Sequence, residues 1–337
     1  MSETEDALRR TLAGALDGLP ARQAAQAVDR LIENYRGATP TAAPVLRNAA
    51  DVAAYAAYRM PATFESVRAA LGALRTAAGD WAPASHVDIG GGTGAATWAV
   101  ADAWPAERDT VVIDWAEPAL ELGKQLAAGS GLPALAGVEW RRQVVGTGLE
   151  LPDTDLVTVS YVLGELTGPD RAAVVDAAAD AAQAVVVVEP GTPDGYRRVI
   201  EARGRLIEAG FTVAAPCPHD GTCPIMAAAN PAEPAVDWCH FAARVQRSSL
   251  HRKVKGGALG HEDEKFSYVA AVRFPVRPAA NRVVRHPQIR KGLVMLRLCT
   301  AEDGLAGENV SKRHGPLYRA ARDVEWGDAW PPGDLTL

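Results

Sequence analysis

Apolar residues in the first part of the chain recur every three to four positions, which is the period of an amphipathic helix. The pattern predicts helices over residues 5–18, 21–36 and 49–58, separated by segments rich in Gly and Pro. The sequence Arg59-Met60-Pro61-Ala62 breaks the period. Thr63 is a good N-cap for a further helix that ends near Gly79.

From His86 onwards, short apolar runs alternate with helical segments. The runs predict six strands, over residues 86–90, 110–114, 138–145, 155–160, 184–189 and 211–215. The segments between them predict helices over residues 93–102, 118–128, 169–182 and 195–209. The fifth run is apolar at every position before Glu189, which is typical of a parallel strand buried on both faces. The alternation predicts an α/β fold.

The alternation stops after residue 215 and resumes near residue 266. We expect a strand over residues 266–274, then a hairpin formed by residues 282–285 and 293–299. Residues 323–337 are rich in Trp, Pro and Asp and are predicted to form a loosely packed tail.

The composition is that of a globular protein with one large domain or two, since the chain has 337 residues, 48% hydrophobic and 23% charged. No apolar run reaches the ~18 residues needed to cross a bilayer. The N-terminal sequence Met-Ser-Glu-Thr-Glu-Asp lacks the features of a signal peptide. We therefore expect a cytoplasmic protein without a membrane partner, in which disulfides rarely persist.

Charge is distributed unevenly along the chain. The net charge is -6, but residues 240–300 hold 13 Lys and Arg and only 3 Asp and Glu. A basic surface on an acidic protein suits contact with nucleic-acid phosphates. The alternative is a solvated basic face that binds nothing.

A glycine-rich loop joins the first predicted strand to the helix after it. Its sequence is Asp88-Ile-Gly90-Gly91-Gly92-Thr93-Gly94. Glycines let the backbone turn sharply and approach a ligand closely. Asp114 ends the second predicted strand, where a carboxylate can accept hydrogen bonds from both hydroxyls of a ribose. The alternative is a nucleotide-binding fold that has lost its ligand.

This Asp-x-Gly-x-Gly-x-Gly pattern resembles motif I of the class I S-adenosylmethionine (SAM)-dependent methyltransferases, over about residues 80–275. The resemblance implies a Rossmann-like α/β fold with a seven-stranded sheet whose last strand is antiparallel. It also implies a SAM site at Asp88, Gly90, Gly92, Gly94 and Asp114, with the last residue on the ribose.

No catalytic residue is identified. The sequence after the fourth strand is Ser160-Tyr161-Val-Leu-Gly164-Glu165, without the Asn/Asp-Pro-Pro-Tyr/Phe motif of amino-methylating enzymes. Glu165 is a candidate base, although a Glu at a helix start is more often a dipole partner or a cap. No cysteine lies near strands four and five to act as a nucleophile.

All four cysteines follow the sixth strand, at Cys217, Cys223, Cys239 and Cys299. Their spacing is not that of a zinc ribbon, but thiolates from different loops can converge on one metal ion or cluster. His219 and His240 could replace a thiolate or support one from outside the ligand set. The alternative is four unrelated buried thiols.

Several segments resemble the mitochondrial small-ribosomal-subunit methyltransferase-like family. They are Tyr58-Arg59-Met60-Pro61-Ala62, Pro216-Cys217-Pro218-His219, Asp237-Trp238-Cys239-His240-Phe241, Glu262-Asp-Glu-Lys265-Phe266-Ser267-Tyr268 and Arg290-Lys291-Gly292. The resemblance implies a four-iron four-sulfur (4Fe-4S) cluster held by the four cysteines, with zinc as the alternative. It also implies SAM binding and association with the small ribosomal subunit during assembly, and leaves methylation of rRNA open.

These expectations give four regions. They are a helical N-terminal region (1–80), a methyltransferase-like domain (81–275) with a Cys-rich metal-binding insertion (216–265), a C-terminal β extension with the fourth cysteine (276–322), and a tail (323–337).

Basic residues flank the third and fourth cysteines, so a cluster that joins these segments would order one RNA-binding surface. The expected rRNA contacts are Arg244, Arg247, Arg252, Lys253, Lys255, Arg290 and Lys291, with Arg282 and Arg285 nearby. No DNA partner is expected, and the oligomeric state is not predicted. Two other functions fit the sequence: a methyltransferase of a small molecule or protein with structural zinc, and a binding module without a working SAM site.

Overall fold

The computed structural model describes residues 2–15, 49–227, 237–247, 260–302 and 304–333. Its main sheet contains eight strands. They are β1 (Ser85–Ile89), β2 (Asp109–Asp114), β3 (Glu139–Arg142), β4 (Thr154–Ser160), β5 (Ala182–Pro190), β6 (Thr212–Ala215), β7 (Phe241–Gln246) and β8 (His261–Val272). The predicted strands of the α/β region are thus found at nearly the expected positions.

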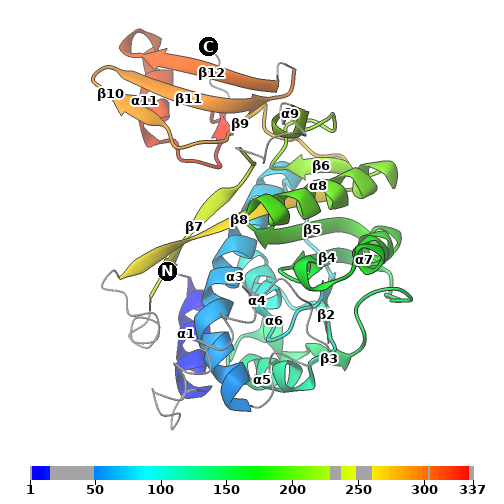
Figure 1. Ribbon diagram of the computed structural model, residues 1–337. Coiled ribbons are helices and arrows are strands. Elements are labelled where there is room, and N and C mark those ends of the chain that lie inside the picture. The colour runs from blue at the N-terminus through cyan, green and yellow to red at the C-terminus, as the bar shows by residue number, and fades with distance from the viewer. Residues whose placement is uncertain (1, 16–48, 228–236, 248–259, 303, 334–337) are drawn as a thin grey trace.

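The strand order is β3-β2-β1-β4-β5-β8-β6, and β8 is antiparallel to both of its neighbours in this path (Figure 1). The mixed sheet and the antiparallel strand confirm the expected Rossmann-like methyltransferase fold. The expected count of seven strands is wrong, because β7 pairs with the first half of β8 and extends the sheet as a hairpin. The range 216–265 therefore includes sheet residues as well as the cysteine segments.

Two helical layers cover the sheet. Along β5, Val186 and Val188 face the layer of α1, α3, α4 and α5, whereas Val185 and Val187 face α7 and α8. This alternation explains why the strand is apolar at successive positions. The helices are α1 (Glu3–Ala15), α3 (Ala49–Ala78), α4 (Ala95–Ala103), α5 (Glu117–Ala128), α6 (Pro133–Ala136), α7 (Gly168–Ala181), α8 (Pro193–Glu208) and α9 (Pro224–Ala227).

Helix α3 corrects one prediction, since it runs without a break through Pro61. Proline removes a backbone hydrogen bond at a cost of about 3 kcal/mol. The helix tolerates this cost because Met60, Phe64, Leu71 and Leu74 are buried along it, and each buried large side chain stabilises the fold by roughly 1.5–3 kcal/mol. Thr63 therefore lies inside a helix and is not its N-cap.

A second sheet follows, as Figure 1 shows above the main one. Its strands are β9 (Asn281–Val283), β10 (Gln288–Arg290), β11 (Leu293–Thr300), β12 (Gly304–Ser311) and β13 (Ala329–Trp330). We call it the C-terminal sheet. The expected antiparallel pairing with β11 is confirmed, since Leu298 lies opposite Val283, but the hairpin itself is formed by β10, which lies between the two predicted strands in the chain. The short 3₁₀ helix η2 (Lys312–His314) follows β12, and helix α11 (Pro316–Asp323) packs against the core of this sheet.

The tail was predicted wrongly where the structure describes it. Trp330 is only 1% exposed, lies in β13 opposite Asn281, and donates from Nε1 to Glu308 at 3.0 Å. A Trp can close a small core with its ring while its N–H finds an acceptor. Among the described helices, none is long and apolar enough to span a lipid bilayer.

Candidate functional site

The glycine loop lies between the carboxyl end of β1 and the start of α4. Gly90, Gly92 and Gly94 have positive φ angles of 65°, 53° and 83°, a region that residues with a side chain rarely adopt. Asp88, fully buried before the loop, accepts hydrogen bonds from Thr158 Oγ1 at 2.9 Å and Thr97 Oγ1 at 3.0 Å. Burial raises the pKa of Asp88 to about 6.

Most of these glycines are also required by the protein's own packing. A Cβ on Gly90 would lie 2.5 Å from Val162, and one on Gly94 would lie 2.7 Å from Trp140. Gly92 differs, because a Cβ there would have, among the described residues, only the Asp114 carboxylate within 4 Å, at 3.7 Å. The open side of Gly92 is therefore where a ligand could approach the loop.

Asp114 ties the loop to the end of β2. Its Oδ2 accepts from the amide of Gly92 at 2.9 Å, and its Oδ1 accepts from the amide of Ala116 at 2.8 Å. Burial raises the pKa of this carboxyl group. Trp115 follows and is 46% exposed, so a large apolar ring stands at the same edge of the sheet. Sequence reasoning had not singled out Trp115.

A polar network beside the loop joins segments that are far apart in sequence. Arg59 on α3 pairs with Glu264 on β8 at 3.0 Å, and the Tyr161 hydroxyl lies 3.2 Å from the same carboxylate. Ser66 Oγ lies 3.0 Å from that hydroxyl. Tyr161 has a φ of 58°, in the left-handed region. Arg59 and Glu264 fall in segments that carried the family resemblance, but the contact between them was not predicted.

Two carboxylates lie near the ends of β4 and β5. Glu165, the candidate base, is exposed in the 3₁₀ helix η1 (Leu163–Glu165). Glu189 is fully buried, accepts from the amide of Leu163 at 3.1 Å and pairs with Arg198 at 2.6 Å. Nothing in this geometry assigns a catalytic role to Glu165.

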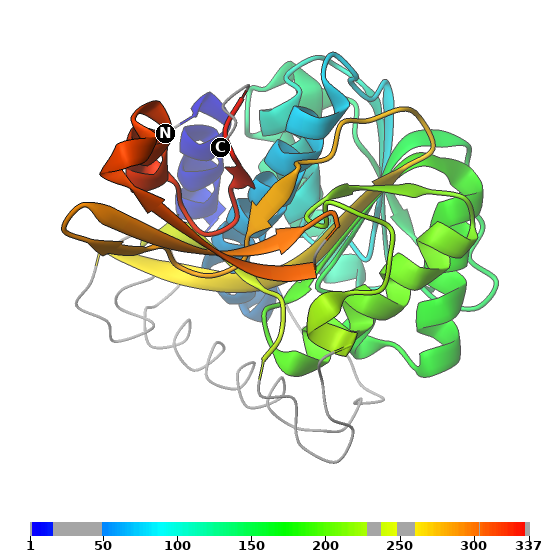
Figure 2. The ribbon, with the colours of Figure 1, turned by 90° about the horizontal axis from the view of Figure 1, so that it is seen from above.

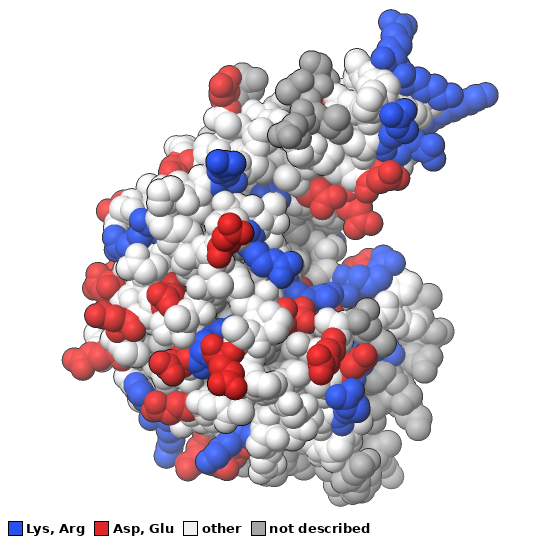
Figure 3. Space-filling model, turned by 180° about the vertical axis from the view of Figure 1, so that it is seen from behind, with Lys and Arg blue, Asp and Glu red and all other residues white. Residues whose placement is uncertain are grey.

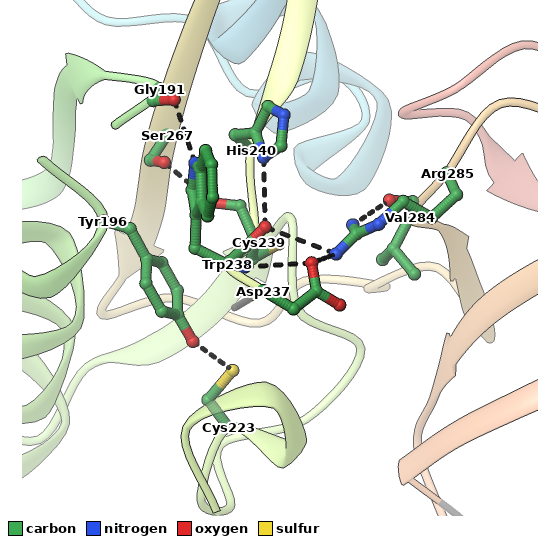
Figure 4. Close-up of polar contacts among 10 residues, drawn as sticks. All are labelled: Gly191, Tyr196, Cys223, Asp237, Trp238, Cys239, His240, Ser267, Val284 and Arg285. Carbon is green, nitrogen blue, oxygen red and sulfur yellow. Dashed lines mark hydrogen bonds and ion pairs between the residues drawn. The ribbon is translucent and has the colours of Figure 1, made fainter. Parts of the chain in front are cut away.

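The four cysteines come from four separate segments that the fold brings together. Cys217 follows β6, Cys223 precedes α9, Cys239 precedes β7 and Cys299 lies in β11. All four are free thiols. The Tyr196 hydroxyl lies 3.1 Å from Cys223 Sγ, a contact drawn as a dashed line in Figure 4, and Cys299 Sγ lies 3.9 Å from Nε2 of His219.

Burial and neighbouring thiols raise the pKa of two of the cysteines. Burial raises the pKa of Cys239, and the other three cysteines raise it further. The pKa of Cys299 rises to about 12, first through burial and then through Cys217 and Cys223. A site that penalises thiolates in this way would favour a bound cation. Four thiols are also a suitable donor set for zinc or an iron–sulfur cluster.

The cysteine side chains are not arranged as the ligands of a metal ion. Within the residues that the structure describes, no three His, Cys, Asp or Glu side chains are arranged to hold one metal ion. The expected four-cysteine metal site is therefore not confirmed, although its segments converge. Both candidate histidines lie nearby: His219 Nδ1 is buried without a hydrogen-bond partner among the described residues, and His240 Nδ1 contacts the carbonyl oxygen of Trp238 at 3.0 Å.

Two buried arginines hold the cysteine loop. Arg203 on α8 donates to the carbonyl oxygens of His219 and Gly221 at 2.7 and 2.8 Å. Arg282 on β9 donates to the carbonyl oxygen of Pro216 at 2.9 Å. Arg285 pairs with Asp237, which precedes the third cysteine segment (Figure 4). The C-terminal sheet is thus attached to the cysteine segments through side chains that sequence reasoning had assigned to a basic surface.

The residues expected to contact RNA differ in their surroundings. Arg244 on β7 and Arg247 directly after it pair across the hairpin with Asp263 at 2.9 Å and Glu262 at 2.7 Å. Arg290 and Lys291 are exposed at the β10–β11 turn. The remaining three, Arg252, Lys253 and Lys255, lie outside the described residues. Figures 1 and 2 show that the β7–β8 and β10–β11 hairpins project from the same side of the molecule.

Comparison with known proteins identifies a family. Residues 49–331 match the family described as mitochondrial small ribosomal subunit Rsm22. The human mitochondrial ribosome assembly protein METTL17 is 30% identical over 301 residues, which cover 82% of this chain and 62% of that protein. The Rsm22-cox11 tandem protein 2 of Schizosaccharomyces pombe, also mitochondrial, is 27% identical over 187 residues, covering 44% and 24% of the two chains. This chain therefore spans less than two thirds of either relative.

Solved structures resemble this chain weakly. Magnesium protoporphyrin IX methyltransferase from Synechocystis PCC 6803 with bound SAH has a TM-score of 0.41 and 13% identity, covering 63% of this chain and 84% of that one. An O-methyltransferase family protein from Burkholderia thailandensis has a TM-score of 0.41 and 16% identity, covering 56% and 64%. The fold assignment rests on the strand order instead.

The comparisons correct the expected location. A cytoplasmic protein was expected, but the family and both relatives are described as mitochondrial. The expectation rested on a short acidic segment, and such a segment does not determine the compartment of a protein.

Proposed function

We propose, from the premise that this chain belongs to the mitochondrial small ribosomal subunit Rsm22 family, that it is an RNA-binding assembly factor of the small ribosomal subunit. The observation that carries the proposal is the family match over residues 49–331, which includes the glycine loop and all four cysteines. SAM and a metal centre are the proposed cofactors.

The proposed SAM site is the glycine loop with Asp114. Gly90, Gly92 and Gly94 would hold the methionine part, and Asp114 would accept from the ribose hydroxyls through lone pairs that its two amide donors leave free. Asp88 would hold the loop from beneath through Thr97. Support comes from the open side of Gly92, where the Asp114 carboxylate is the only group of the described residues within 4 Å of a Cβ placed there.

Calorimetry with SAM tests this site. Asn tolerates a left-handed backbone, so Gly92→Asn should fold while its side chain fills the open side. Gly131→Asn is the matched control, because Gly131 has a φ of 72° and open space around it, away from the loop. We expect binding to wild type and Gly131→Asn, and none to Gly92→Asn. Equal heats for all three proteins would remove the loop as the SAM site.

The proposed metal centre is a 4Fe-4S cluster held by Cys217, Cys223, Cys239 and Cys299, with zinc as the alternative metal. Bound metal would cross-link the four segments and supply folding free energy to them. Anaerobic purification tests it: visible absorption that bleaches with dithionite, with about four iron and four sulfide per chain, is expected. Colourless protein with one equivalent of zinc would replace the cluster by a structural zinc ion.

Association with the ribosome is tested by sedimentation with purified small subunits. We expect the protein to sediment with small subunits and not with large ones, and the binding to weaken steeply as salt is added. Binding that ignores salt, or equal binding to both subunits, contradicts the proposal.

A further inference from the structure

The outer end of the C-terminal sheet gathers four basic side chains from two separate segments. Arg290 and Lys291 lie at the β10–β11 turn, and Lys312 and Arg313 follow β12. The two segments are adjacent, because Leu293 pairs with Ser311 and the amide of Lys312 donates to the carbonyl oxygen of Gly292 at 3.2 Å. We call these four residues the basic tip. Figure 3 shows Lys and Arg side chains projecting together there.

The basic tip forms no ion pair within the described residues, although Figure 3 shows acidic side chains on the surface next to it. Residues 281–300 contain five Lys and Arg and no Asp or Glu. All four side chains of the tip are exposed, and none forms an ion pair with another residue of the described ranges. Arg244 and Arg247 differ, because they already form ion pairs with Asp263 and Glu262. An arginine that is already paired with a carboxylate would gain little binding free energy from a phosphate.

The form of the tip also suits a nucleic acid. Neighbouring strands lie about 4.8 Å apart, so cations at the end of β10, in the β10–β11 turn and after β12 span roughly 10 Å. Backbone pairing holds them in place, which lowers the ordering cost of binding. Ile289, 57% exposed beside Arg290, adds an apolar contact that a sugar or base can cover.

We propose that the basic tip is the surface through which this protein contacts the phosphates of a folded RNA, and that the ion-paired Arg244 and Arg247 are not contact residues. This inference rests on the proposed function. It places the bound RNA at one end of the C-terminal sheet. Sequence reasoning had expected Arg290 and Lys291 but had not found Lys312 and Arg313, which are contiguous with them only in the fold.

Binding to a small-subunit rRNA transcript, measured over a range of salt concentrations, tests the tip. The variant replaces Arg290, Lys291, Lys312 and Arg313 by Ala. The control replaces four exposed, ion-paired arginines by Ala, which changes the net charge equally: Arg142, Arg197, Arg205 and Arg244. We expect the tip variant to lose at least about tenfold in affinity and about three units of salt slope, and the control to bind as wild type.

The outcomes separate the two proposals. Absence of RNA binding by wild type contradicts the proposed function, whereas wild-type binding with an unaffected tip variant, or equal losses in both variants, overturns the tip alone. Polyglutamate that competes as well as RNA, at equal charge, would assign the tip to an acidic protein. Melting temperatures within a few degrees of wild type show that a loss of binding is not a loss of fold.

Discussion

Arg282 donates from Nε to the carbonyl oxygen of Pro216 at 2.9 Å, so a residue of the C-terminal sheet holds the segment that leads into Cys217. Its Nη1 donates to the carbonyl oxygen of Gly327 at 3.0 Å. The side chain is only 6% exposed. One buried guanidinium therefore joins three segments that are far apart in sequence, and the C-terminal sheet cannot move independently of the cysteine loop without breaking these bonds.

Replacing Arg282 by Met should destabilise the protein by about 2–4 kcal/mol, because a buried and a partly buried carbonyl group lose their donor. Urea unfolding measures this loss. Arg297→Met, on the exposed face of β11, is the control and should change stability by less than about 0.5 kcal/mol. Equal effects of the two variants would show that Arg282 does not join the segments.

Tyr161→Phe should cost about 2 kcal/mol, because Glu264 loses a hydrogen bond from the Tyr161 hydroxyl and keeps only Arg59. The backbone at Tyr161 stays in the left-handed region in both proteins, so the comparison isolates the hydroxyl group. Tyr318→Phe, at the edge of the C-terminal core, serves as the control. Unfolding free energies within about 0.5 kcal/mol of each other would argue against the network.

Asp88 should make the stability fall as the pH rises from about 4 to about 6. Its folded pKa of about 6 lies above its ordinary value of 3.8, so the folded state binds more protons than the unfolded state in this window. The loss amounts to about 3 kcal/mol and is complete above the folded pKa.

Asp88→Asn should remove this pH-dependent component, which denaturant unfolding at several pH values would show as a difference from wild type. Asp170 offers a control of opposite sign, because hydrogen bonds from Thr167 and Thr147 lower its pKa. Its contribution is present above its ordinary pKa and is lost only as the pH falls further. Asp170→Asn should therefore leave the slope between pH 4 and 6 unchanged.

The sequence was a good guide where one local pattern determines structure. Strands β1, β2, β4 and β5 are buried apolar runs, and the glycine loop follows β1 as its sequence predicted. Helix α3 was divided wrongly at Pro61, because the burial of Phe64 and Leu71 that compensates for the proline is a tertiary property. Helix propensities, which describe single residues, cannot predict this burial.

The site was harder to predict because its contacts are long-range. Strand β7 was taken as a basic segment, since its cross-strand carboxylates Glu262 and Asp263 lie on the far side of a gap in sequence. Strand β12, with its glycines and polar residues, has no strong strand signal, and Lys312 therefore could not be placed beside Arg290. The cysteines were found from composition alone, but the arginines that hold their loop were not.

The last prediction concerns whether the four cysteines act as one unit. If they hold one metal centre, Cys223→Ser and Cys299→Ser should each lose the metal and destabilise the protein by several kcal/mol, since metal binding contributes folding free energy. The double variant should then cost little more than either single one, because the centre is already lost. Unrelated buried thiols would instead give losses that add. Unfolding of all four proteins, with metal analysis of each, decides between these readings: additive losses in proteins that never contained metal would contradict a shared centre, whatever the distance between the two sulfur atoms.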